Sequence, residues 1–214
     1  MQSKYLFQDI VPKLELRLQS DLPGFESHLK MAPIFKGTKF RNFNPTADAR
    51  NSAVLILLMP LENSFEILFT LRSEKLNSHS GQISFPGGRQ DKGESFVETA
   101  LRETKEEVGI HPDKIKVLGS LSQLFVPPSN SVITPIVGIA DKIDNYTLSE
   151  NEVQEVFTVD YNKFVTDDFF AKEIRNMNGL DVEVPYWNVH SKTKLWGATA
   201  IILQEFIDII EELV

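Results

Sequence analysis

The feature that most constrains the fold is a well-marked amphipathic helix over residues 95–108, which follows a long loop containing Gly, Ser and Pro. Ser95, with Glu98 three residues later, matches a capping box, and Gly109 supplies the left-handed residue that commonly ends a helix. Five residues at helical spacing are predicted to form its buried stripe: Val97, Ala100, Leu101, Thr104 and Val108. Such a helix needs an apolar surface to cover, and the strands predicted around it supply one.

Apolar runs separated by turn signals predict those strands and two further helices. The predicted strands are 52–59, 65–71, 82–85, 116–124, 131–140, 152–159 and 182–187. Helical spacing predicts an N-terminal helix over 5–19 and a closing helix over 195–214; 20–50 is predicted to be irregular, and 161–170 is ambiguous. These elements indicate the α/β class, as an α/β/α sandwich with a mixed β-sheet and N- and C-terminal helices. We expect an N-terminal helix with an irregular extension over 1–50 and a main domain over 51–214.

The composition narrows the range of functions. The formal net charge is −8, which disfavours nucleic acid as a partner because binding to its backbone uses a basic surface. An acidic protein that handles an anionic small molecule needs a counter-charge, and a metal cation can supply it. The chain has no Cys, so thiolate metal sites and Cys nucleophiles are excluded. The longest apolar run, 53–60, is too short to span a membrane, and we expect a cytoplasmic protein without a membrane partner.

The polar face of the 95–108 helix carries a cluster of carboxylates. Glu103, Glu106 and Glu107 stand at positions i, i+3 and i+4, so their side chains share one surface. Carboxylate oxygens are the ligands that Mg²⁺ and Mn²⁺ prefer, and the face predicts a metal site unless it is a solvated acidic surface. Arg102 can orient Glu103 through a charge-assisted bond, and the carbonyl of Gly88 could face the same metal.

The spacing around this cluster resembles the Nudix box across its full 23 residues. Gly88 is followed after five residues by Glu94, and after seven more by the run 102–110, RETKEEVGI. Thr104 is the one soft departure, because many members carry an aliphatic residue there. The resemblance implies a Nudix fold, Mg²⁺ or Mn²⁺ bound by the box glutamates, and attack of a metal-activated water on a diphosphate.

The general base has two sources among Nudix enzymes. In some members a box glutamate serves, which corresponds here to Glu103, with Arg102 beside it as a catalytic candidate. In other members the base is a glutamate from a later loop or strand, for which Glu152 and Glu155 are the candidates, with Glu155 preferred. Simple alternation on a half-exposed strand would explain both glutamates equally well.

The residues before the box resemble the coenzyme A diphosphatase branch of the same family. They read Thr70-Leu71-Arg72-Ser73 at the start and Phe85-Pro86-Gly87-Gly88 at the end, with Gly81 between. The resemblance favours coenzyme A as substrate, with 3′,5′-ADP and 4′-phosphopantetheine as products. The substrate-binding candidates are Arg72, Ser73, His79 and Gly87. Asn77 departs from the branch, many members of which carry a basic residue there, and this puts recognition of the 3′-phosphate in question.

Two other functions stay open at this point. The first is a Nudix pyrophosphatase for ADP-ribose, nucleoside diphosphate sugars or NADH, which is favoured by the absence of a basic residue at Asn77. The second is a Nudix module that senses a nucleotide without cleaving it, although such modules often lose box carboxylates that this chain retains. In each case the expected partner is a small nucleotide diphosphate, and the two terminal helices could pair two chains as a homodimer.

Overall fold

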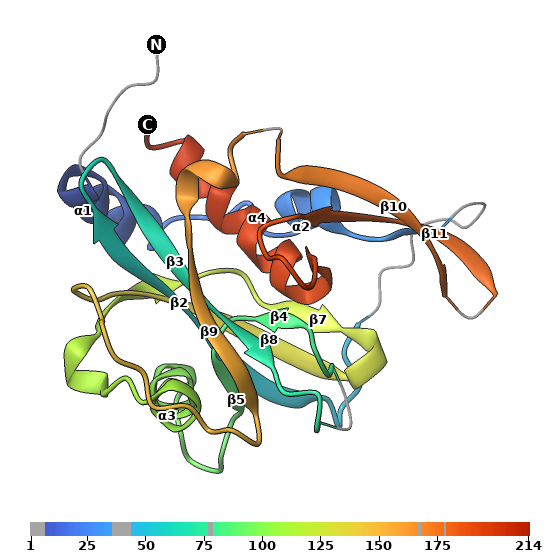
Figure 1. Ribbon diagram of the computed structural model, residues 1–214, viewed down its shortest axis with the longest axis horizontal. Helices are drawn as coiled ribbons and strands as arrows, with labels where there is room; N and C mark the ends of the chain where they lie inside the picture. The colour runs from blue at the N-terminus through green and yellow to red at the C-terminus, as the bar shows by residue number, and fades with distance from the viewer. Residues whose placement is uncertain (1–6, 36–43, 77–78, 167, 178) are drawn as a thin grey trace.

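The computed structural model describes residues 7–35, 44–76, 79–166, 168–177 and 179–214, and they form two β-sheets with helices packed around them (Figure 1). The larger sheet has eight strands: β2 (Arg50–Leu61), β3 (Ser64–Arg72), β4 (Ile83–Ser84), β5 (Gly87–Arg89), β6 (Lys116–Ser120), β7 (Leu124–Val126), β8 (Ser131–Ile139) and β9 (Val153–Asp160). The smaller sheet has four: β1 (Ile34–Phe35), β10 (Phe170–Met177), β11 (Leu180–Trp187) and β12 (Leu195–Trp196). The α-helices are α1 (Phe7–Arg17), α2 (Phe25–Met31), α3 (Phe96–Val108) and α4 (Gly197–Glu211), and single 3₁₀ turns occur at Pro112–Lys114, Pro127–Ser129 and Tyr161–Lys163.

The larger sheet is mixed, as the sequence predicted. Strand β2 runs parallel to β8 and antiparallel to β3 and β5. Its middle residues are buried on both faces, which explains why its sequence is continuously apolar rather than alternating. The order β4-β3-β2-β8-β6 places β2 at the centre, with β5 paired beside its first residues.

Helices cover both faces of this sheet, so the α/β/α sandwich is confirmed (Figure 1). One apolar cluster lies between the sheet and α3, and includes Leu55, Leu57, Ala100 and Val108. A larger cluster lies on the opposite face and joins the sheet to α1 and α4. Helix α3 packs against both β2 and β5, and this packing positions the candidate site.

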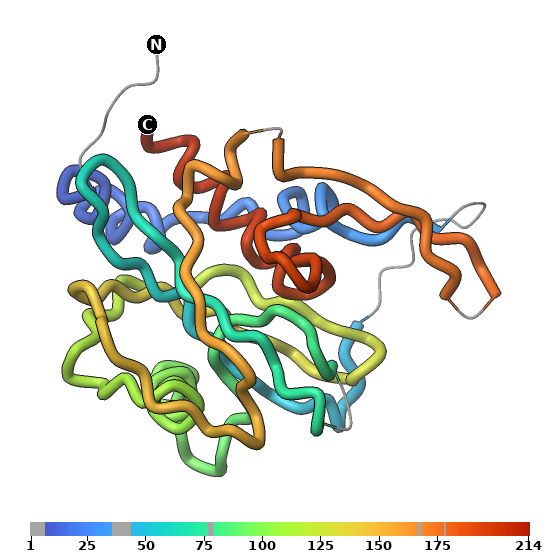
Figure 2. Tube along the Cα trace, in the orientation of Figure 1, coloured from blue at the N-terminus to red at the C-terminus, as the bar shows by residue number. Residues whose placement is uncertain are grey.

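The N-terminal segment shares the larger cluster with the C-terminal helix. Leu14 of α1 is fully buried, and Arg17 Nε donates to Glu212 Oε2 at 2.7 Å. Figure 2 shows the start of the described chain beside the end of α4. The division of the chain at residue 50 stays a prediction, but the described N-terminal residues pack into the same core as the rest.

Several elements differ from the sequence prediction, among them the short strands β1 and β5, which it did not include. Helix α2 lies in the region predicted to be irregular, and β10 follows the ambiguous segment as one arm of a hairpin that extends away from the body (Figure 2). The predicted strand 116–124 is divided into β6 and β7, and between them the backbone N–H of Ser122 donates to Glu205 rather than to β8. Helix α4 begins at Gly197 rather than at Leu195, since Leu195 and Trp196 pair with β11. Within the described residues, no helix is long and apolar enough to cross a membrane.

Candidate active site

Helix α3 begins and ends where its sequence signals predict. Ser95 Oγ accepts the backbone N–H of Glu98 at 3.2 Å, and Glu98 Oε2 accepts the backbone N–H of Ser95 at 2.7 Å, which completes the capping box. Gly109 follows the helix with φ of 77°. The predicted buried stripe is wrong at Val97, which is 36% exposed, while Thr99 is fully buried. Thr104 is buried and its hydroxyl donates to the carbonyl of Ala100, so the helix satisfies this polar group internally.

The carboxylate face of α3 lies directly against strand β5. A Cβ added to Gly88 would lie 2.5–2.6 Å from the carboxylate atoms of Glu103, so only glycine permits this approach. The backbone N–H of Gly87 donates to Glu107 Oε2 at 3.2 Å. The two glycines therefore bring main-chain atoms next to two of the predicted metal ligands, Glu103 and Glu107.

Arg102 links the loop before the helix to the carboxylate cluster. Its guanidinium contacts Glu94 at 2.7 and 3.1 Å, Glu103 at 2.8 Å and Glu106 at 3.2 Å. It also donates to the carbonyl of Arg89 at 3.0 Å. The bonds from Arg102 hold the pKa of Glu94 at about 2, so Glu94 stays ionised. Arg102 thus holds the loop through Glu94 and orients Glu103, and the second of these is the role that the sequence predicted for it.

Glu107 is the most strongly perturbed acid of the site. Burial raises its pKa to about 8, and the charges of Glu103 and Glu152 act in the same direction. The Gly87 N–H and the Arg72 guanidinium, 4.0 Å away, offset only part of that shift. Burial also raises the pKa of Glu103. The site therefore gathers carboxyl groups in a poorly solvated place that disfavours their charged forms, and an added cation would favour ionisation.

The donor set fits a hard divalent cation, although the side chains are not arranged around one point. In the described part of the chain, no three acidic or histidine side chains form a ready cation cluster, since Arg102 engages both Glu103 and Glu106. The groups that could hold Mg²⁺ or Mn²⁺ are Glu103, Glu106, Glu107 and the carbonyl of Gly88. All of them offer oxygen, which is the ligand type these ions prefer.

At the end of β3, Arg72 brings a positive charge and an N–H donor close to Glu107. Arg72 lies beside Glu107, and its Nε is buried without a hydrogen-bond partner among the described residues. Ser73 is 4% exposed, and its backbone N–H donates to the carbonyl of Glu152 at 2.8 Å. A buried N–H that lacks a partner is costly, so Arg72 is prepared to receive an anionic ligand.

The later glutamates occupy different surroundings. Glu155 pairs with Lys192 at 3.2 Å and with His190 at 3.4 Å. Burial alone would raise the pKa of Glu155, but these two partners lower it overall. Glu152, in contrast, is close enough for its charge to act on both Glu103 and Glu107. Glu155, the preferred candidate, is thus held by two basic partners, whereas the charge of Glu152 acts on the carboxylate cluster.

The predicted loop candidate His79 contacts a residue of its own loop. His79 is exposed in a left-handed conformation with φ of 56°, and its Nδ1 contacts Gln82 Oε1 at 3.0 Å within the same loop. Asn77 lies outside the described residues. Sequence reasoning assigned no role to His190, which is buried against Phe157 and Glu155; no short spacing to another chemical group marks it in the sequence.

Comparison with known proteins agrees with this geometry. The sequence profile of the NUDIX domain matches residues 49–177. "Nudix hydrolase 3" of Caenorhabditis elegans is 30% identical over 201 residues, covering 86% of this chain and 84% of that protein. "Peroxisomal coenzyme A diphosphatase NUDT7" of Mus musculus is 31% identical over 146 residues, covering 68% of this chain and 60% of that protein. A solved Nudix hydrolase from M. smegmatis, RenU, shares the fold with a TM-score of 0.56 and 16% identity, covering 78% of this chain and 88% of that one.

Proposed function

The chain belongs to the Nudix family of hydrolases, enzymes that act on diphosphate bonds, and we propose that its substrate is coenzyme A or a coenzyme A derivative. The reaction would use Mg²⁺ or Mn²⁺ and would give 3′,5′-ADP and 4′-phosphopantetheine. A cytoplasmic location and a homodimer formed through the terminal helices stay predictions, and the mouse relative is named as a peroxisomal protein.

The observation that carries this proposal is that carboxylates, glycine main-chain atoms and an arginine lie close together. The carboxylates of Glu103 and Glu107 lie against the Gly87–Gly88 main chain, and Arg72 stands beside Glu107 with a free buried donor. Carboxylates supply ligands for a metal, and an arginine supplies a matching group for a phosphate oxygen. A diphosphate needs both kinds of group, because the substrate and the carboxylates are all negatively charged.

Each residue has a distinct task in the proposed reaction. When bound, the divalent metal would lower the pKa of a water and stabilise negative charge on the phosphates. Glu103, Glu106, Glu107 and the Gly88 carbonyl are the groups that would hold it. Arg102 keeps Glu103 in place through the 2.8 Å bond, and Arg72 would bind a phosphate oxygen through its unpaired Nε–H. The buried position of Glu107 limits the water around it, which strengthens every charge interaction nearby.

For the general base, we favour Glu152. Its charge already acts on Glu103 and Glu107, so it lies near the place where a water would be activated. Glu155 is committed to Lys192 and His190, which lowers its pKa and its strength as a base. Glu103 stays a candidate from within the box, since Nudix enzymes use either source.

Coenzyme A is favoured over other diphosphates by the segment before the box. The Thr70–Ser73 run includes Arg72, which lies beside Glu107, and Phe85 and Pro86 lead directly into the two glycines. The relative from Mus musculus is named as a coenzyme A diphosphatase, which supports the same substrate for this chain. ADP-ribose, nucleoside diphosphate sugars and NADH are the competing substrates, and a non-catalytic sensor is the remaining alternative.

The test is a comparison of kcat/KM for coenzyme A, ADP-ribose, a nucleoside diphosphate sugar and NADH, with Mg²⁺, with Mn²⁺ and after chelation. The proposal expects the highest value for coenzyme A and no turnover after chelation. A higher value for another diphosphate would replace the substrate and leave the site intact. Absence of turnover for every compound would favour the sensor.

A further inference from the structure

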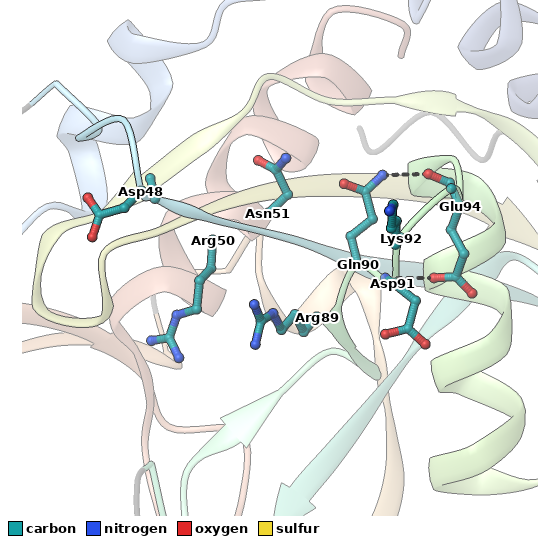
Figure 3. A pocket seen from close by; sticks show the side chains of 10 residues that line it. Asp48, Arg50, Asn51, Arg89, Gln90, Asp91, Lys92 and Glu94 are labelled. Carbon is teal, nitrogen blue, oxygen red and sulfur yellow. Dashed lines mark hydrogen bonds between the residues drawn. The ribbon is translucent and has the colours of Figure 1, made fainter.

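A second polar pocket opens beside the candidate active site, between the start of β2 and the loop that leads from β5 to α3 (Figure 3). Its volume of about 390 Å³ exceeds what a single phosphate group needs. The lining comes from the start of β2 and from the loop that follows β5: Asp48, Ala49, Arg50, Asn51, Arg89, Gln90, Asp91, Lys92, Gly93 and Glu94. Three of these side chains are basic, in a protein whose net charge is −8.

The strand register brings two of the basic residues together. Arg89 pairs with Ser52 across the β2–β5 ladder, and Arg50 precedes Ser52 by two residues. Residues related in this way are diagonal neighbours on the same face of a sheet, within reach of long side chains. In Figure 3 the guanidinium groups of Arg50 and Arg89 extend to the same side of β2.

These two cations lack carboxylate partners among the described residues. Arg50 forms no ion pair there and donates only to the carbonyl of Ser129, at 2.7 Å. The guanidinium of Arg89 has neither an ion pair nor a hydrogen bond within the described ranges, and the same holds for the ammonium of Lys92. Like charges placed side by side repel each other, and an anion between them would remove that cost.

The acidic residues of the lining do not neutralise this pair. Glu94 accepts two bonds from Arg102, at 2.7 and 3.1 Å. Asp48 accepts from the hydroxyl of Thr46 at 2.7 Å. Asp91 is exposed, and its carboxylate points away from Arg50 in Figure 3. The centre of the pocket therefore presents guanidinium groups, while the carboxylates are engaged or face solvent.

We propose that Arg50 and Arg89 form a binding site for a phosphomonoester of the substrate, separate from the groups that act on the diphosphate. Arg89 directly follows Gly88, and its carbonyl accepts from Arg102 at 3.0 Å, so the pocket and the carboxylate cluster share one wall. A nucleotide with its diphosphate at Gly88 would place a further phosphate on its ribose within reach of these cations. The inference rests on the proposed function and deepens it, because this phosphate distinguishes coenzyme A from ADP-ribose and NADH.

Binding of two small probes tests this site without requiring turnover. Isothermal titration calorimetry with Mg²⁺ would compare adenosine 3′,5′-bisphosphate with AMP on the wild type, Arg89→Gln and Lys172→Gln. Arg89→Gln is the primary variant because it breaks no contact among the described residues. Lys172→Gln removes the same charge from β10, in the other sheet. A lost charge-assisted bond to phosphate corresponds to about tenfold or more in affinity.

The expected result is that the wild type and Lys172→Gln bind the bisphosphate at least about tenfold more tightly than AMP. Arg89→Gln should lose that difference with AMP affinity unchanged, and Arg89→Lys should keep part of it. Equal wild-type affinities for the two probes, or an equal loss for both in Arg89→Gln, would overturn the proposal. Hydrolysis of coenzyme A is measured separately. If the wild type prefers the bisphosphate to AMP but does not cleave coenzyme A, the proposed function alone is refuted. If it cleaves coenzyme A but binds the two probes equally, this site alone is refuted.

Discussion

Replacing Gly88 by Ala tests how closely the main chain and the carboxylate cluster fit together. The new Cβ would lie 2.5–2.6 Å from three atoms of Glu103, whereas ordinary contacts between such atoms are about 3.5 Å. The carboxylate must therefore retreat by about 1 Å, away from the bond that Arg102 donates at 2.8 Å. Gly88 does not have a positive φ, so alanine introduces no backbone strain at this position.

The size of the effect follows from this displacement. A reacting or metal-holding group that is misplaced by about 1 Å can cost about a hundredfold in rate, or about 3 kcal/mol of transition-state stabilisation. The lost Arg102–Glu103 bond is partly exposed and should reduce the free energy of unfolding by only about 1 kcal/mol. Gly88→Ala should thus stay folded while kcat falls about a hundredfold.

The assay is steady-state turnover of the preferred diphosphate at saturating Mg²⁺, with the melting temperature measured on the same samples. Gly179→Ala is the matched control, because Gly179 has a φ of 82° in the turn between β10 and β11, with no atom within 4 Å of the added Cβ. It should lose a similar amount of stability and keep its activity. A folded Gly88→Ala protein with kcat within about threefold of wild type would refute the reasoning.

Four further substitutions test the packing of the core, a buried charge and the identity of the general base. Leu14→Ala should lower the free energy of unfolding by about 2–5 kcal/mol in urea titrations, because the side chain is fully buried between α1 and the sheet; a loss under about 1 kcal/mol would contradict this packing. Glu205→Gln should cost about 3 kcal/mol, since fully buried Glu205 accepts from His28 and from two backbone N–H groups. Burial alone would raise the pKa of Glu205, but these bonds lower it below 4.5, so its contribution is complete above that pH and is lost in acid. The melting temperatures of wild type and Glu205→Gln should accordingly converge as the pH falls below 4.5, and a constant difference would argue against the linkage. Glu152→Gln should lower kcat by about tenfold to hundredfold and Glu155→Gln by much less; the reverse order would restore Glu155 as the base.

The central helix and its site could be predicted from sequence because their signals are local. The capping box, the terminal Gly109 and the i, i+3, i+4 carboxylates all belong to the single segment 95–109. The approach of Gly88 to Glu103 follows from the same short segment, since the loop leads directly into the helix. In the first turn, Thr99 is buried where Val97 was predicted to be, because apolarity alone does not fix the direction in which that turn faces.

The remaining elements depend on partners that are distant in sequence. Helix α2 has only seven residues, and its contacts with Glu205 and Asp208 come from α4. Strand β10 alternates between exposed and half-buried residues, several of them charged, and exists through its pairing with β11. The choice between Glu152 and Glu155 depends on the irregular pairing of β3 with β9 at Arg72, which no pattern in either strand specifies. The arginine pair at Arg50 and Arg89 likewise follows from the β2–β5 register.

The most direct test of the account is mass-spectrometric product analysis of coenzyme A incubated with Mg²⁺ and either the wild type or Glu107→Gln. Burial penalises the charge of Glu107, so the glutamine variant should be at least as stable as the wild type, and a loss of activity cannot be attributed to unfolding. We expect 3′,5′-ADP and 4′-phosphopantetheine from the wild type and a rate lower by at least about a hundredfold from the variant. Equal product formation by the two proteins would contradict the assignment of this carboxylate cluster as the metal site.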